Sequence, residues 1–273
     1  MKKKNRLSFW EKTLNQLFTL RGLYVLIVIA LITLYPVYVS DGQKWTYIEN
    51  FGIKLPLRYN IHGIDVSHHN EAIDWQQVKN SENDKVEIRF CFIKATEGED
   101  LKDPDFETNW RESKKTGLIR GAYHFYVPRT NPVEQAQNFI ESVVLEKGDF
   151  APVIDFEIEG KGRKVRQNLL ENVKTFIKIL ENHYGVKPII YTNGHLYRMY
   201  VRSNLDNYPL WISNYDSQKL EGYKDAKLMI WQHSTTGKVD GIRGDVDFNV
   251  FVASQMHLDD ICIKTSTRPI GTP

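Results

Sequence analysis

The sequence predicts an α/β protein whose main domain is a barrel of eight strands with an incomplete ring of helices, preceded by a single N-terminal transmembrane helix. Three observations support this prediction. Strand and helix patterns alternate between residues 61 and 191, strand patterns alone follow as far as residue 252, and an apolar run at residues 23–39 follows a basic segment. An open, doubly wound sheet is the alternative arrangement for the alternating part.

The composition is that of an ordinary globular protein. The 273 residues are 41% hydrophobic and 26% charged, which is sufficient for one sizeable core. The formal net charge of +2 gives no support to nucleic-acid binding. Cys91 and Cys262 form neither a metal-binding motif nor a disulfide framework, so they indicate no compartment.

The first 60 residues divide into three predicted segments. Residues 1–22 are basic, with Glu11 as the single acid. Residues 23–39 are apolar almost throughout and have about the minimum length for a membrane span, and residues 40–60 are expected to form a stalk. The positive charge before the span predicts that the N-terminus stays in the cytoplasm and that residues 41–273 lie outside it. A cleaved signal peptide is the alternative, and it delivers the domain to the same side.

Residues 61–253 are predicted to form the barrel domain, and residues 254–273 a C-terminal tail. Strands are expected at residues 61–66, 87–94, 119–126, 151–158, 188–191, 209–213, 227–233 and 245–252. Helices are expected from residue 74, at 105–116, at 131–145 and along an amphipathic stripe at 165–184. Asp74 is a typical N-cap, Pro132 fits a first turn, and Gly185 is a typical stop. The gaps after residue 191 are too short and too polar for full crossover helices.

Acidic side chains are expected to converge at one end of this barrel. In barrels of this kind the chemistry lies at the carboxyl ends of the strands. Asp155 and Glu157 end the fourth strand and share one face, because side chains two positions apart point the same way. Asp65 ends the first strand and Asp247 lies on the eighth, and these strands are neighbours in a closed barrel. Buried acids cost free energy unless they are paired or used in chemistry.

The same strand ends supply the walls of the predicted site. The candidates for substrate binding are Tyr123, Lys94, Tyr191, Trp211, Trp231 and Gln232. Lys94 could instead pair with Glu97. An acidic floor with aromatic walls suits glycoside cleavage, in which one carboxylic acid protonates the leaving oxygen and another carboxylate stabilises the oxocarbenium-like centre. The histidines of this region lack a zinc-binding spacing, so we expect no metal.

Seven short motifs lie in order along residues 61–252. They are GIDVSHH (63–69), IDW (73–75), FIKATEG (92–98), GAYHF (121–125), DFE (155–157), WQ (231–232) and VDFN (246–249). Together they resemble the glycoside hydrolase family 25 lysozymes, the Chalaropsis-type N-acetylmuramidases. The resemblance implies a modified TIM-like (β/α)5(β)3 barrel. It also implies cleavage of the β-1,4 bond between N-acetylmuramic acid and N-acetylglucosamine in peptidoglycan, without a cofactor.

The resemblance also implies roles for single residues. Glu157 matches the general acid/base, and Asp155 matches the partner carboxylate, either as nucleophile or as the group that orients the substrate 2-acetamido. Asp65 and Asp247 match supporting acids, and Tyr123 matches an aromatic residue of the cleft. The expected partner is the glycan strand of peptidoglycan. We therefore expect a monomer at the cell envelope, held in the membrane by its N-terminal helix, with the catalytic domain periplasmic or extracellular.

The chain departs from the family pattern at two places. Asn70-Glu71 stands where the family usually has Gln followed by Gly, and Phe156 stands where Leu commonly separates the two carboxylates. Neither change removes a catalytic carboxylate, although the first could alter the loop after the first strand and hence a subsite. A catalytically inactive glycan-binding barrel and a metal-dependent hydrolase are the alternative functions.

Overall fold

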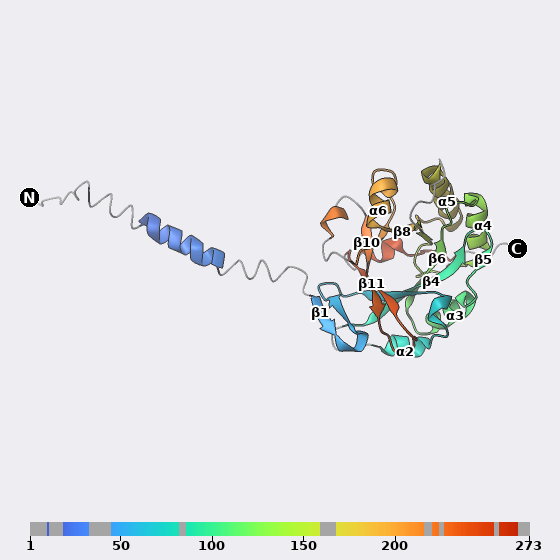
Figure 1. The fold of residues 1–273 in the computed structure, drawn as a ribbon, viewed down its shortest axis with the longest axis horizontal. Coiled ribbons are helices and arrows are strands. Elements are labelled where there is room, and N and C mark those ends of the chain that lie inside the picture. Colours follow the sequence, from blue (N-terminus) through green and yellow to red (C-terminus); the bar gives the residue numbers. More distant parts are fainter. Residues whose placement is uncertain are drawn as a thin grey trace, which may run out of the picture. The chain divides into compact units, whose positions relative to one another are not determined.

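The structure is a computed structural model, and Figure 1 shows its fold. It describes residues 10, 19–32, 45–81, 86–158, 168–215, 220–223, 227–253 and 257–266. The chain divides into two compact units, Met1–Lys44 and Trp45–Pro273. The segment boundaries drawn from the sequence within these units stay predictions.

The transmembrane helix predicted at residues 23–39 is wrong in this structure. Residues 19–32 are helical, and residues 33–44 lie outside the described residues. Within the described ranges, no helix is long and apolar enough to cross a membrane. The fold class is corrected accordingly to an eight-stranded barrel with helices.

The second unit is built around a closed barrel (Figure 1). In sheet order its strands are β3 (His62–Val66), β11 (Val246–Phe251), β10 (Leu228–Gly237), β9 (Leu210–Ser213), β8 (Ile189–Asn193), β7 (Val153–Asp155), β6 (Ile119–Phe125) and β4 (Ile88–Glu97). A parallel pairing of β3 with β4 closes the ring and excludes the open sheet. β11 runs antiparallel to both of its neighbours, and the other barrel pairs are parallel. The short β5 (Leu101–Lys102) pairs with the end of β4.

Helices follow the earlier barrel strands along the chain. They are α2 (Trp75–Asn80), α3 (Phe106–Lys115), α4 (Pro132–Ser142) and α5 (Leu169–Tyr184), followed after β8 by α6 (Gly194–Leu196) and the π-helix η3 (Tyr197–Val201). Short 3-10 helices lie at η1 (Glu49–Phe51), η2 (His68–Asn70), η4 (Glu221–Tyr223) and η6 (Asp259–Ile261). The predicted caps are present, because the Asp74 carboxylate accepts from the backbone N–H groups of Gln76 and Gln77, and Gly185 ends α5 in the left-handed region.

Two apolar layers hold the barrel together. The inner layer fills the barrel and includes Phe90, Phe92, Phe150, Val153, Ile189, Trp211, Ile230 and Phe251. The outer layer joins the strands to the helices and includes Val78, Phe106, Phe139, Ile154, Phe176 and Leu180. The rings of Phe90 and Phe92 occupy the space where a Cβ at Gly63 or Gly121 would lie, so both strands need glycine there. Phe92 also stacks on Trp211 with ring centroids 4.4 Å apart, which packs the barrel interior below the site.

An antiparallel hairpin packs against the strands late in the chain. It consists of β1 (Trp45–Ile48) and β2 (Ile53–Pro56), joined by η1. Phe51 packs on Phe248 of β11 with centroids 5.1 Å apart, and Trp45 meets Trp231 of β10 edge-on at 5.5 Å. Residues 45–56 therefore lie in the same compact unit as the barrel, within the region for which the sequence predicts a stalk.

A C-terminal segment packs at the opposite end of the barrel from the predicted site. The backbone N–H of Ala151 donates to Ile261 O at 2.8 Å, and that of Ile263 donates to Asp149 O at 2.8 Å. These bonds lie just before the first residue of β7, and Ile261 and Cys262 belong to the inner apolar layer. The described part of the predicted tail, residues 257–266, is thus packed against the barrel.

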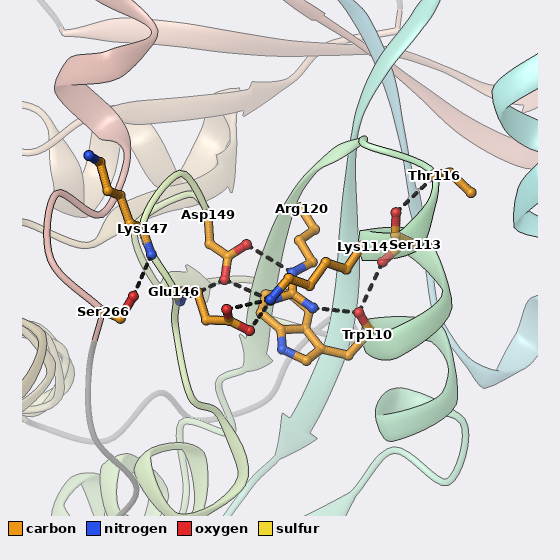
Figure 2. A network of polar contacts seen from close by, with 9 residues as sticks. All are labelled: Trp110, Ser113, Lys114, Thr116, Arg120, Glu146, Lys147, Asp149 and Ser266. Carbon is orange, nitrogen blue, oxygen red and sulfur yellow. Dashed lines mark hydrogen bonds and ion pairs between the residues drawn. The ribbon is translucent and has the colours of Figure 1, made fainter.

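A buried ionic cluster lies beside this segment (Figure 2). Arg120 of β6 is buried and binds Asp149 through two bonds, Nε to Oδ1 at 2.8 Å and Nη2 to Oδ2 at 3.0 Å. Its Nη1 donates to Trp110 O at 2.6 Å, and its guanidinium lies 3.9 Å from the centroid of the Trp110 ring. Nη2 also contacts Glu146 Oε1 at 3.2 Å. The cluster joins α3, β6 and the loop before β7.

Candidate active site

A pocket with about 400 Å³ of empty space opens at the carboxyl ends of the barrel strands. Its lining consists of Asp65, Tyr123, Asp155, Glu157, Tyr191, Trp211, Gln232 and Asp247. The alternation of side chains along each strand explains this set, because residues two positions apart face the same side. The structure therefore brings together all four acids that the sequence analysis singled out.

Strand register places the acids on two sides of the pocket. Asp65 of β3 and Asp247 of β11 are directly opposite each other on adjacent antiparallel strands. Asp155 is the last residue of β7, where it pairs with Tyr191 of β8, and Glu157 follows two positions later. Asp155 is buried and Glu157 is half-buried, so the pair reaches from the floor towards the mouth of the pocket.

The residue between these two acids faces away from the pocket. Phe156 is fully buried and packs edge-on against Tyr126 at 6.3 Å and Tyr200 at 5.9 Å, measured between ring centroids. Its backbone N–H donates to Tyr191 O at 2.9 Å, which fixes the chain between Asp155 and Glu157. The phenyl ring therefore anchors the strand end in the outer apolar layer, in the place where the family commonly has Leu.

A network of amide groups holds the two acids of the floor. Asn249 Nδ2 donates to Asp65 Oδ2 at 2.6 Å. Gln232 Nε2 donates to the same oxygen at 2.8 Å and to Asp247 Oδ2 at 3.3 Å. Gln232 Oε1 in turn accepts from the hydroxyls of Tyr191, at 2.8 Å, and Tyr215. The floor is thus a connected set of hydrogen bonds that extends to Tyr215, which is half exposed.

Burial and crowding change the proton affinity of these groups. Burial raises the pKa of both Asp65 and Asp247, and the negative charge of Asp65 raises the pKa of Asp247 further. The hydrogen bonds from Asn249 and Gln232 act in the opposite direction on Asp65. The pKa values of Tyr123 and Tyr191 are also raised, mainly by burial and then by the nearby carboxylates, so both hydroxyls stay protonated near neutral pH.

Two of the predicted substrate-binding residues lie outside the pocket lining. Trp231 packs against Trp45 on the outer side of the barrel, and its Nε1 donates to Asn214 O at 2.9 Å. Lys94 is buried and pairs with Glu97, Nζ to Oε2, at 2.6 Å, which is the alternative considered from the sequence. Its Nζ also lies 5.0 Å from the centroid of the Phe125 ring. Their roles in substrate binding stay predictions.

Trp211 does line the pocket, but as part of its floor. It is buried, its Nε1 donates to Asn249 Oδ1 at 2.8 Å, and Tyr191 meets it with centroids 4.6 Å apart. Since Phe92 stacks on the same ring, Trp211 connects the apolar interior of the barrel to the polar network above it.

Two features near the acids were not predicted from the sequence. Tyr215 follows β9 without any periodic signal, so no sequence pattern identifies it. His68, the first residue of η2, is bound to Asp103, with the backbone N–H at 3.1 Å and Nδ1 at 2.7 Å from Asp103 Oδ2. His68 lies in the first motif and Asp103 lies in none, so only their spatial pairing shows the contact.

His124, in the motif at residues 121–125, belongs to the barrel wall. The Nδ1 of His124 lies 2.7 Å from the Thr96 hydroxyl, and its Nε2 lies 3.1 Å from Gln135 Oε1. Burial lowers the pKa of His124 to about 4, so the ring is neutral at physiological pH. Across the described ranges, no group of three or more His, Cys, Asp or Glu side chains is placed to hold a metal ion.

Comparison with known proteins gives consistent relatives. The sequence profile described as glycosyl hydrolases family 25 matches residues 64–242. The protein YegX of Escherichia coli O6:H1 is 41% identical over 204 residues, which cover 75% of this chain and 74% of that protein. Lysozyme M1 of Streptomyces globisporus is 30% identical over 72% of this chain and 70% of its own. A family 25 glycosyl hydrolase from Bacillus anthracis has a TM-score of 0.68 and 29% identity, covering 80% of this chain and 97% of its own.

Proposed function

Because the chain belongs to the glycosyl hydrolases family 25, we propose that it is a lysozyme that hydrolyses the β-1,4 bond between N-acetylmuramic acid and N-acetylglucosamine in peptidoglycan. The observation that carries this proposal is the pocket lined by four acids and three aromatic residues. Peptidoglycan lies outside the cytoplasm, so the barrel acts at the cell envelope.

The positions of two acids support the division of labour proposed for them. Glu157 is half-buried at the pocket mouth, where it donates a proton to the oxygen of the leaving sugar. Asp155 is buried one layer deeper, where its carboxylate stabilises positive charge at the anomeric carbon or orients the 2-acetamido group.

The other lining residues shape the pocket around the sugar. The neutral hydroxyls of Tyr123 and Tyr191 add polar contacts without adding charge, because their raised pKa values keep them protonated. Asp65 and Asp247 lie opposite each other on the floor and act on the bound sugar through hydrogen bonds. Trp211 beneath them excludes water from the floor, since its ring is sealed between Phe92 and Tyr191.

The test is digestion of defined peptidoglycan by the purified chain, with products identified by mass spectrometry. Muramidase action leaves N-acetylmuramic acid at the new reducing end, whereas glucosaminidase action leaves N-acetylglucosamine. Glu157→Gln is expected to lower the rate at least about 100-fold while the protein stays folded, because general acid catalysis contributes on that scale. Glu107→Gln, an exposed glutamate on α3, is the matched control and keeps full activity.

Two other results would redirect the proposal. Binding to glycan strands without any cleavage over long incubation would indicate an inactive glycan-binding barrel. Loss of activity on exhaustive chelation, with recovery on adding a divalent metal, would indicate a metal-dependent hydrolase. Undiminished activity of Glu157→Gln would remove that residue as the acid.

A further inference from the structure

The side-chain amide of Gln232 uses all of its hydrogen-bonding capacity within the protein. A glutamine amide has two N–H donors and one carbonyl oxygen with two lone pairs. The donors serve Asp65 at 2.8 Å and Asp247 at 3.3 Å. The carbonyl oxygen accepts from the hydroxyls of Tyr191 and Tyr215. No polar atom of this side chain is left for a substrate, although Gln232 lines the pocket.

The floor acids fix the orientation of that amide, and the two tyrosines match it. An ionised Asp65 only accepts hydrogen bonds, so the group of Gln232 that faces it is the N–H₂ group. The carbonyl oxygen then faces the two tyrosine hydroxyls. Burial raises the pKa of both hydroxyls, so each keeps its proton and can donate it. The reverse orientation would turn the carbonyl oxygen of this buried amide towards the carboxylate of Asp65.

The floor acids receive unequal numbers of donors. Asp65 Oδ2 accepts from Gln232 and also from Asn249 at 2.6 Å, whose own orientation is fixed because its Oδ1 accepts from Trp211. Asp247 accepts from Gln232 alone among these amides, at 3.3 Å. Hydrogen bonds to a carboxylate favour its ionised form, so the negative charge is stabilised on Asp65.

We propose that Gln232 is a positioning residue that keeps Asp65 ionised and holds the proton shared by the floor acids on Asp247. The proton on Asp247 then lies in the side-chain hydrogen bond that joins Asp247 to Asp65, and Asp65 remains an anion. Tyr191 and Tyr215 act through Gln232 by donating to its carbonyl oxygen. The effect of Gln232 on turnover rests on the proposed lysozyme function. The effect of Gln232 on the protonation of the two carboxyl groups is independent of that function.

The direct test is a titration of the aspartate side-chain carboxyl carbons by NMR in the full-length chain. In the wild-type protein the two floor acids are expected to lose their protons in two separate steps. In Gln232→Leu the lower step is expected to move upward by about one to two pH units, because Asp65 loses a charge-assisted hydrogen bond. The acidic limb of the pH profile of kcat/KM moves by the same amount, since ionised Asp65 belongs to the active form.

Two further variants separate positioning from other effects. Gln137→Leu is the matched control, because Gln137 Nε2 donates to the Glu141 carboxylate at 2.7 Å on the exposed face of α4. It is expected to leave both the floor titration and activity unchanged. Should Gln232→Leu fail to fold, the double variant Tyr191→Phe with Tyr215→Phe is the substitute. It keeps the amide and removes only the two hydroxyls that donate to the carbonyl oxygen of Gln232. It is expected to move the lower step in the same direction.

The outcomes are distinct. An unmoved lower step together with a raised KM would show that Gln232 contacts the substrate, and this would overturn the inference. An unmoved step in the double variant would overturn the role of the tyrosines in acting through Gln232. A wild-type protein that cleaves no glycan would defeat the proposed function, and the carboxyl titration would still decide whether Gln232 positions the proton.

Discussion

Replacing Glu71 by glycine is expected to stabilise the protein. Glu71 directly follows η2 and has φ 54° and ψ −151°, a backbone conformation that is open to glycine and strained for other residues. Such strain costs about 1–3 kcal/mol. Two losses oppose the gain. Glycine has more freedom in the unfolded chain, worth about 0.4–1 kcal/mol. The exposed ion pair with Arg243, 3.2 Å from Nη1 to Oε2, is worth about 0–1 kcal/mol.

The balance is a gain of about 1 kcal/mol in the free energy of unfolding, which raises the Tm by about 2–4 °C for a domain of this size. Urea and thermal unfolding at neutral pH measure it. Two controls separate the contributions. Glu71→Ala loses the ion pair but keeps a Cβ in the strained conformation, so it is expected to be no more stable than the wild type. Arg243→Ala loses the pair alone.

The decisive comparison is Glu71→Gly against Glu71→Ala. Equal stability of these two variants would refute the argument, because they differ by the Cβ atom that causes the strain. The comparison also bears on the site, since Glu71 lies on the loop after β3, where the family usually has glycine. Slower turnover in Glu71→Gly, with higher stability, would show that the strained loop serves the pocket.

Two further predictions concern buried charge. Asp149→Asn is expected to destabilise the protein by about 3 kcal/mol in urea unfolding, because it leaves the buried Arg120 guanidinium without its bidentate partner, whereas Glu112→Gln in an exposed pair changes stability by less than about 1 kcal/mol. An equal effect of the two would contradict this. His233 is buried beside Trp45 and Trp231, and burial lowers its pKa to about 3. The fold holds it neutral, so stability is lost as pH falls below the unfolded value of about 6.5. His233→Phe is expected to reduce the loss between pH 7 and 4.5 by about 2–3 kcal/mol. An unchanged pH dependence would show that His233 does not carry it.

The strand ends were the part of the site best predicted from the sequence. Asp65, Asp155, Glu157 and Asp247 share one face because strand alternation is local, and local patterns are visible in a sequence. The same rule separates two neighbouring candidates. Trp231 and Gln232 are adjacent on one strand and point to opposite faces, and Gln232 is the one that lines the pocket.

Other features could not be predicted because they depend on contacts between distant segments. The predicted strand at 151–158 shortens to Val153–Asp155, since the residues before it pair with the C-terminal segment. The hairpin at residues 45–56 shows no strong pattern of its own, and its strands are fixed by packing against β10 and β11. The predicted membrane helix was argued from the apolar composition of residues 23–39, and composition is not by itself a measure of helix formation.

The hairpin and the C-terminal segment extend the folding unit beyond the family match. That match ends at residue 242, before β11, and begins at residue 64, within β3. A fragment cut at those limits would lack β11, which joins β10 to β3 in the ring, would expose Trp231, and would leave the inner layer open at its base. The smallest fragment that keeps every contact described runs from residue 45 to residue 266, so the borders of sequence similarity underestimate the compact unit at both ends.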